Sequence, residues 1–181
     1  MKKLLSIMLV LTMALTLLAG CGGGSRPTGI RAAETPADDV AEYQPRWRSH
    51  TVDSTQYRKV FLAGTIDMGR SSDWQAALVA RFRDSIGGRW LFFNPRRREF
   101  HASPAEMEYQ VAWELAHLEA ADLIVMNLLG DSRSPISLLE MGLYARSGKL
   151  FVACSPDYYR YDNVRITCRR YGVPLYDSLT A

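Results

Sequence analysis

Short apolar runs alternate with segments of helical spacing from residue 59 to the end of the chain. The apolar runs predict buried strands, which we expect at 60–64, 90–93, 123–126, 150–154 and, for a short last strand, 173–175. Apolar side chains three or four residues apart predict the intervening helices, near 74–82, 111–121, 136–146 and 163–171. Strands and helices in alternation favour a parallel sheet covered on both faces. We therefore expect an α/β domain with a flavodoxin-like, Rossmann-like sheet of about five strands.

The first twenty residues have the features of a secretory signal peptide. Residues 1–3 are cationic, and residues 4–18 form an uncharged apolar stretch that is short for a membrane span. The ending Leu-Ala-Gly-Cys at 18–21 resembles the bacterial lipobox. That resemblance implies that Cys21 becomes the lipid-modified first residue of a protein anchored in the bacterial cell envelope, at the outer membrane if the cell is Gram-negative. An ordinary signal peptide with a chance cysteine is the alternative.

Residues 21–56 are predicted to form a flexible tether, followed by one domain over 57–181. The tether begins with three glycines, contains Pro27, Pro36 and Pro45, and has no periodic apolar face. The formal net charge is +3, and removal of the signal peptide with its two lysines lowers it to +1. A charge this small provides no field for a polyanion, so we expect no nucleic-acid partner.

Polar residues that follow the predicted strands are the candidates for a site. In open α/β sheets, ligands bind beyond the carboxyl ends of the strands, which selects the loops 64–70, 94–98, 127–134 and 155–160. Glu140 is unusual because it lies in an otherwise apolar helix, where a carboxylate must pair, face solvent or belong to a site. The histidines and cysteines have no metal-ligand spacing, and we expect no metal and no other cofactor. Whether Cys154 and Cys168 are bonded stays open.

Several motifs in the same order resemble the nucleoside 2-deoxyribosyltransferase superfamily, and in particular its nucleoside 2-deoxyribosyltransferase-like branch. They are F-L-A-G-T-I-D-M-G at 61–69, N-P-R-R at 94–97, W-E at 113–114, A-A-D-L-I-V at 120–125, S-P-I-S-L-L-E-M-G at 134–142 and N-V at 163–164. The resemblance implies cleavage of an N-glycosidic bond by a glutamate nucleophile, at the position of Glu140. In related deoxynucleotide N-hydrolases, an acidic residue eight positions before the strand-opening Asp122 protonates the leaving base, which implies that role for Glu114.

The sheet edge and the resemblance together predict the substrate-binding residues, which are Gly64, Thr65, Asp67, Asn94, Arg96, Asn127 and Ser134. Ser134 stands where the hydrolases have a serine, so hydrolysis is favoured over transfer. Asp67 stands where those hydrolases have a phosphate-binding arginine. Because a carboxylate repels a 5′-phosphate, a nucleoside fits better unless Arg70 or Arg96 compensates.

Three functions remain open at this level. The favoured one is a membrane-anchored enzyme that cleaves or transfers an N-linked (deoxy)ribosyl group of a nucleoside or nucleotide-like small molecule. The second is a non-catalytic lipoprotein that binds such a ligand. The third is a glycohydrolase of NAD or of a signalling nucleotide. The sequence leaves the base, the sugar and the formation of a homo-oligomer undetermined.

Overall fold

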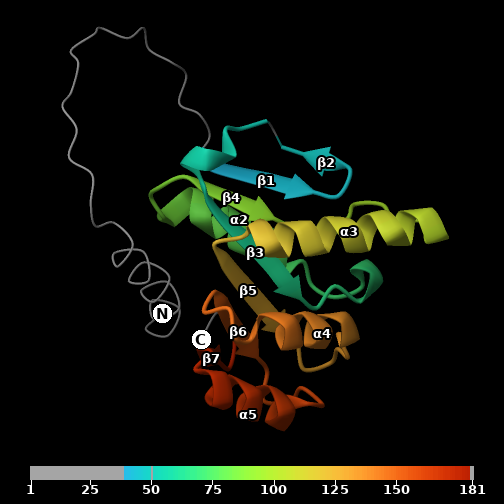
Figure 1. The fold of residues 1–181 in the computed structure, drawn as a ribbon, viewed down its shortest axis with the longest axis vertical. Coiled ribbons are helices and arrows are strands. Elements are labelled where there is room, and N and C mark those ends of the chain that lie inside the picture. Colours follow the sequence, from blue (N-terminus) through green and yellow to red (C-terminus); the bar gives the residue numbers. More distant parts are fainter. Residues whose placement is uncertain (1–38, 50, 180–181) are drawn as a thin grey trace, which may run out of the picture.

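A computed structural model describes residues 39–49 and 51–179 as one sheet with helices on both faces (Figure 1). The seven strands lie in the order β2-β1-β4-β3-β5-β6-β7. Their bounds are β1 Val40–Gln44, β2 Trp47–Arg48, β3 Arg58–Gly64, β4 Trp90–Phe93, β5 Leu123–Leu128, β6 Leu150–Cys154 and β7 Leu175–Tyr176. All neighbouring pairs are parallel except the β1–β2 hairpin. The predicted α/β class is confirmed.

The number of strands differs from the prediction of about five. The five expected strands are β3 to β7, and counted along the chain they lie in the flavodoxin-like order 2-1-3-4-5. The other two, β1 and β2, fall within residues 21–56, so the tether prediction is wrong for 40–48. Its V-A-E-Y-Q segment is short and mixed, but Val40 and Ala41 are buried because β1 pairs in parallel with β4. The signal peptide and Cys21 lie outside the described residues.

The helices cover the two faces of the sheet unequally. Their bounds are α2 Trp74–Ser85, α3 Pro104–Ala120, α4 Pro135–Tyr144 and α5 Tyr161–Tyr171, with short 3-10 turns η1 at Ser54–Gln56 and η2 at Asp67–Gly69. Side chains of α3, α4 and α5 pack into the core on one face, and α2 packs into the core on the other. The helices α3 and α4 thus lie on the same face of the sheet (Figure 1). None of the helices within residues 39–179 has the length and apolar character needed to cross a bilayer.

The carboxyl ends of β3 and β5 form the centre of the sheet edge, where strand order reverses. Gly64 pairs with Asn127 there and has φ +125°. A Cβ at Gly64 would lie 2.2 Å from the Asn127 carbonyl oxygen, so only glycine fits. This close approach brings the loop after β3 against the loop after β5, and both reach the start of α4.

Candidate active site

Glu140 is a buried carboxylate without a polar partner. It lies in α4, exposes 8% of its surface, and forms no hydrogen bond or ion pair with any residue that the structure describes. Burial, and next the negative charge of Glu114, raise the pKa of Glu140 to about 8. The charge of Glu114 on α3 thus acts on Glu140 on α4. The catalytic roles of both residues stay predictions.

Glu114 has one polar partner, which holds one of its two oxygens. Gln110, one turn earlier in α3, donates from Nε2 to Glu114 Oε1 at 2.8 Å and from the same nitrogen to the Pro95 carbonyl oxygen at 3.1 Å. Both partners are acceptors, which fixes the orientation of the Gln110 amide. Burial raises the pKa of Glu114, and the hydrogen bond from Gln110 opposes that rise.

Gln110 was not among the predicted site residues. Its spacing of four from Glu114 was the available signal, because such residues are neighbours on a helix surface. Its Oε1 is buried and has no partner in the part of the chain that the structure describes. A glutamine that orders one carboxylate oxygen leaves the other, Glu114 Oε2, to carry a proton.

The raised pKa values of the two glutamates make them candidates for acid and base chemistry. Repulsion between a buried carboxylate and a half-buried one favours states in which one of the two carboxyls is protonated. Such a pair supplies one acid and one nucleophile or base, which is what glycoside cleavage requires.

Hydroxyl groups form a continuous chain between the loops after β3 and β5. Thr65 Oγ1 lies 2.8 Å from Ser134 Oγ, Ser134 Oγ lies 2.6 Å from Ser132 Oγ, and Ser132 donates to Asp67 Oδ1 at 2.9 Å. Because a carboxylate only accepts, Ser134 donates to Ser132, and Thr65 donates to Ser134. Thr65 Oγ1 in turn accepts the Leu129 N–H at 3.1 Å. Every hydroxyl proton in the chain is therefore used inside the protein.

This hydroxyl chain holds the loop backbones in uncommon conformations. Asp67, Met68 and Ser134 have φ values of 50°, 56° and 40°, in the left-handed region that costs energy for residues with a Cβ. Ser132 belongs to the chain although the sequence did not predict it, since its position depends on the backbone turn before α4. The predicted substrate contacts of Thr65, Asp67 and Ser134 stay predictions.

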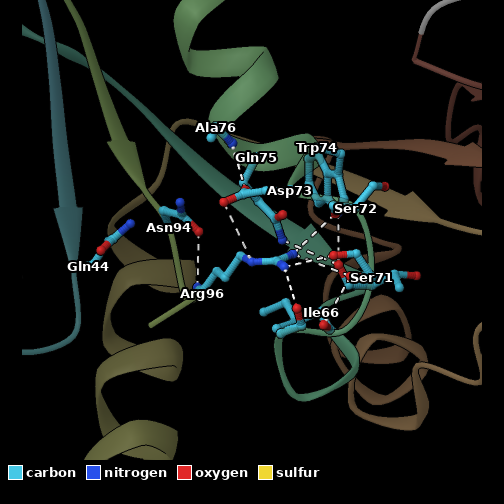
Figure 2. Close-up of polar contacts among 12 residues, drawn as sticks. Gln44, Ile66, Ser71, Ser72, Asp73, Trp74, Gln75, Ala76, Asn94 and Arg96 are labelled. Atoms are coloured by element: carbon cyan, nitrogen blue, oxygen red, sulfur yellow. Dashed lines mark hydrogen bonds and ion pairs between the residues drawn. The ribbon is translucent and has the colours of Figure 1, made fainter. Parts of the chain in front are cut away.

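Arg96 binds the loop that follows η2 (Figure 2). Its guanidinium donates to the carbonyl oxygens of Gly69, Ser71 and Ser72 at 2.8 to 3.2 Å and to Ser71 Oγ at 3.3 Å. It also lies 3.7 Å from Asp73, and its side chain is 11% exposed. The structure thus shows Arg96 stabilising a loop, and its contact with a substrate stays a prediction.

The two predicted asparagines differ in their bonding. Asn94 accepts the Arg96 N–H at 3.0 Å and donates to Glu42 at 2.8 Å, so its amide supports the sheet edge. Asn127 is 6% exposed at the end of β5, and its side chain forms no hydrogen bond with the described residues. Among the predicted polar contacts, Asn127 therefore retains the most hydrogen-bonding capacity for a ligand.

Thiol and metal chemistry find no support at this edge. Cys154 and Cys168 are free and buried, and burial raises the pKa of Cys154 to about 12 and that of Cys168 to about 11. Neither thiol ionises near neutral pH, which makes both poor nucleophiles. No group of three or more potential ligands for a metal lies within the described ranges.

A family model described as "Nucleoside 2-deoxyribosyltransferase like" matches residues 57–158. The matched segment covers more than half of the chain and includes Glu114, Glu140 and the hydroxyl chain. No curated protein matches the sequence.

Proposed function

Since the chain belongs to the nucleoside 2-deoxyribosyltransferase-like family, we propose that it cleaves the N-glycosidic bond of a nucleoside-type substrate. One observation carries the proposal. Glu140 is buried without a polar partner among the described residues, and its pKa is raised in part by the charge of a half-buried carboxylate, Glu114. A structural carboxylate would have acquired hydrogen bonds, whereas a catalytic one is left available to its substrate.

Glu140 is the nucleophile in this proposal and Glu114 is the acid. The Glu140 carboxylate attacks the anomeric carbon as the bond to the base breaks, and the proton on Glu114 Oε2 passes to the departing nitrogen. A glycosyl ester on Glu140 results. Glu114, now ionised, takes a proton from water, and the oxygen of that water attacks the anomeric carbon and releases Glu140. A second base in place of water gives transfer.

The environments of the two carboxyls suit a change in the position of the shared proton. In the protein without substrate, burial raises the pKa of both carboxyls, and at Glu114 the hydrogen bond from Gln110 opposes the rise. Positive charge that develops on the sugar stabilises the Glu140 carboxylate in a site of low polarity. With Glu140 ionised, the proton resides on Glu114, next to the leaving base.

An uncharged nucleoside is the proposed substrate. Asp67 lies at the loop edge, and the guanidinium of Arg96 is already bound by backbone carbonyls. Arg70 donates from Nε to the Asp67 carbonyl oxygen at 3.2 Å. Because neither arginine offers its full set of donors, a 5′-phosphate would meet the Asp67 carboxylate with little compensation.

Base release tests this function. The protein is incubated with a panel of ribo- and deoxynucleosides and their 5′-monophosphates, and free base is separated and quantified. We expect release from nucleosides, and no release by the Glu140→Gln or Glu114→Gln variants. Thermal stabilisation by a nucleoside without release would support the binding protein instead. Release of nicotinamide from NAD would support the glycohydrolase.

We also propose that Cys21 anchors the protein in the cell envelope, on the basis of the lipobox-like sequence at 18–21. The anchor would expose the enzyme to nucleosides outside the cytoplasm. Labelling with a radioactive fatty acid and sensitivity of processing to globomycin test this, with Cys21→Ser as the control. Unlabelled protein in the soluble fraction would contradict it.

A further inference from the structure

Positive charge gathers on and beside α5. Residues 146–172 contain six Lys or Arg and two Asp, whereas the whole chain has 22 Lys or Arg against 19 Asp or Glu. Figure 1 shows α5 at one end of the sheet, next to β6 and β7. Arg146 reaches the same helix, because it donates to the Tyr171 hydroxyl at 3.4 Å. Ile166 and five arginines form what we call the α5 cationic surface; the arginines are Arg146, Arg160, Arg165, Arg169 and Arg170.

Most of this charge is not neutralised by the protein. Arg165 forms an ion pair with Asp162 at 2.9 Å, and both side chains are exposed to solvent. Three other arginines of the surface are exposed, and their guanidinium groups form no hydrogen bond or ion pair with any residue in 39–49 or 51–179: Arg160, Arg169 and Arg170. A guanidinium group presents several N–H donors that suit phosphate oxygens. These groups are therefore available to an anionic partner.

Helix stability accounts for only part of this charge. Arg169 and Arg170 lie in the last turn of α5, where cations interact favourably with the helix dipole. Arg160 lies at the N-cap, where a cation is unfavourable for the same reason, and its side chain forms no cap hydrogen bond. The helix thus does not require a cation at its first residue, and a partner outside the described residues would explain it.

An exposed aliphatic side chain lies among the arginines. Ile166 exposes 49% of its surface and precedes Arg169 and Arg170 by three and four residues, the spacing of neighbours on one helix face. Val164 and Cys168 are buried on the opposite side of α5. Cations around an apolar group suit the surface of an anionic bilayer, because the apolar group enters the headgroup region while the cations bind phosphates.

We propose that the α5 cationic surface binds the headgroups of an anionic phospholipid bilayer. The proposal goes beyond the catalytic function, and it rests on the proposed Cys21 anchor only for bringing the domain near a bilayer. Each cationic side chain near such a surface strengthens binding roughly fivefold, so a few arginines can dock a domain that is already tethered. A nucleic acid also presents phosphates, but its phosphate backbone offers no apolar layer for Ile166.

The length of chain between Cys21 and β1 permits both attachments. Seven strands about 4.8 Å apart make a sheet roughly 30 Å wide, with β1 near one end and β6 near the other. The residues from 21 to 39 can span at most about 60 Å. A lipid on Cys21 and the α5 cationic surface can therefore contact the same bilayer.

A fluorophore on α5 tests the contact in the full chain. Ile166→Cys is labelled with the polarity-sensitive dye NBD and mixed with vesicles of phosphatidylcholine, or of phosphatidylcholine and phosphatidylglycerol in equal amounts. Ala80→Cys, exposed on α2, is the matched control, and the unsubstituted chain gives the background labelling. We expect a blue shift at residue 166 with the anionic vesicles, an apparent affinity at least tenfold lower for the neutral vesicles, and no shift at residue 80.

Charge reversal then tests whether the arginines carry the binding. Arg169→Glu with Arg170→Glu should weaken the apparent affinity for the anionic vesicles at least tenfold. Arg81→Glu with Arg83→Glu on α2 changes the net charge equally and should have less than a threefold effect. Arg169→Gln with Arg170→Gln places no anion at the end of α5 and should give an intermediate loss. Circular dichroism checks that each variant is folded.

The inference is overturned if residue 166 responds equally to both kinds of vesicle, if residue 80 shifts as much, or if the substitutions at 169 and 170 leave binding unchanged. It is also overturned if an oligonucleotide at equal phosphate concentration removes the shift, which would identify a nucleic-acid surface. These readings depend on neither turnover nor lipidation. Failure of the inference would therefore leave the proposed function and the anchor intact, and failure of either of those would leave this test valid.

Discussion

The hydroxyl chain and the carboxylate pair lie at the same edge of the sheet and differ in how their polar groups are satisfied. Thr65, Ser134 and Ser132 pass their protons along to Asp67, and no hydroxyl proton remains for a ligand. Within residues 39–49 and 51–179, Glu140 has no hydrogen-bond partner, and Glu114 has one, Gln110. Polar groups whose hydrogen bonds are satisfied within the protein hold loops in place, whereas a buried carboxylate without such bonds is a candidate for catalysis. The hydroxyl chain thus supports the site, and the carboxylate pair is its proposed reactive part.

The largest expected effect is the loss of activity in Glu140→Gln. The amide has nearly the same shape but is not a nucleophile, so we expect kcat to fall by roughly 10³-fold or more. Base release under substrate saturation measures this. Glu108→Gln on the exposed side of α3 is the matched control and should retain wild-type activity. A kcat of Glu140→Gln within tenfold of wild type would show that Glu140 is not the nucleophile, and the carboxylate pair would no longer differ from the hydroxyl chain in its role.

The same substitution should change how stability depends on pH. The pKa of Glu140 is about 8 when folded, against 4.5 as an ordinary value. Between these values the folded protein holds a proton that the unfolded chain releases, so rising pH destabilises the wild type by roughly 3–5 kcal/mol in total. The Glu140→Gln variant has no carboxyl at this position to titrate, so its stability should not fall in this way as the pH rises. Urea unfolding should find the variant more stable at pH 9 and similar to wild type near pH 5, and parallel pH curves would contradict the prediction.

Removing a hydroxyl of the hydroxyl chain should lower the free energy of unfolding, whereas Glu140→Gln should raise it at high pH. Ser134→Ala breaks two buried hydrogen bonds, and we expect about 1–3 kcal/mol of destabilisation. Ser134→Gly removes the same bonds but relieves the positive φ of 40°, and it should be about 1 kcal/mol more stable than the alanine variant. Unfolding at pH 5, where Glu140 is protonated in both, measures the difference. Equal stability of the wild type and both variants would show that the hydroxyl chain does not stabilise the loops.

The smallest expected effect is at Gln110. Its amide nitrogen is hydrogen-bonded within the protein, yet it contacts the proposed acid Glu114. Gln110→Met keeps the size but removes the donor to Glu114 Oε1, and the pKa of Glu114 should rise. Because Glu114 acts as the acid and must hold its proton, the alkaline limb of kcat/KM should move to higher pH. A purely structural role would lower stability without moving that limb. An unchanged limb would therefore show that Gln110 does not act through Glu114.

Local patterns in the sequence were sufficient for most of the fold. The strands β3 to β7 follow from short apolar runs, and the α/β class follows from their alternation with helices. The strand β1 was missed because its burial depends on pairing with Trp90 and its neighbours, fifty residues away in the sequence. Such a pairing leaves no local signal in a five-residue segment that precedes a proline.

The site was predicted in part. The motif resemblance led to Glu114 and Glu140, and the charge of Glu114 acts on Glu140 in the structure. Their catalytic roles stay predictions. It also suggested Arg96 and Ser134 as ligand contacts, and their hydrogen bonds to loops depend on backbone turns with positive φ that motifs do not report. Ser132 and Gln110 were missed for a related reason, since their importance comes from what they touch rather than from their residue type.

The most direct measurement locates a covalent sugar on the protein. The enzyme is incubated with a nucleoside whose 2′-fluorine slows release of the glycosyl ester, digested with trypsin, and analysed by mass spectrometry. Glu140 and Glu114 fall in different tryptic peptides, residues 134–146 and 99–133. We predict a sugar adduct on Glu140 in the first peptide. An adduct on Glu114, or base release with no adduct on either residue, would contradict the assignment of Glu140 as the nucleophile.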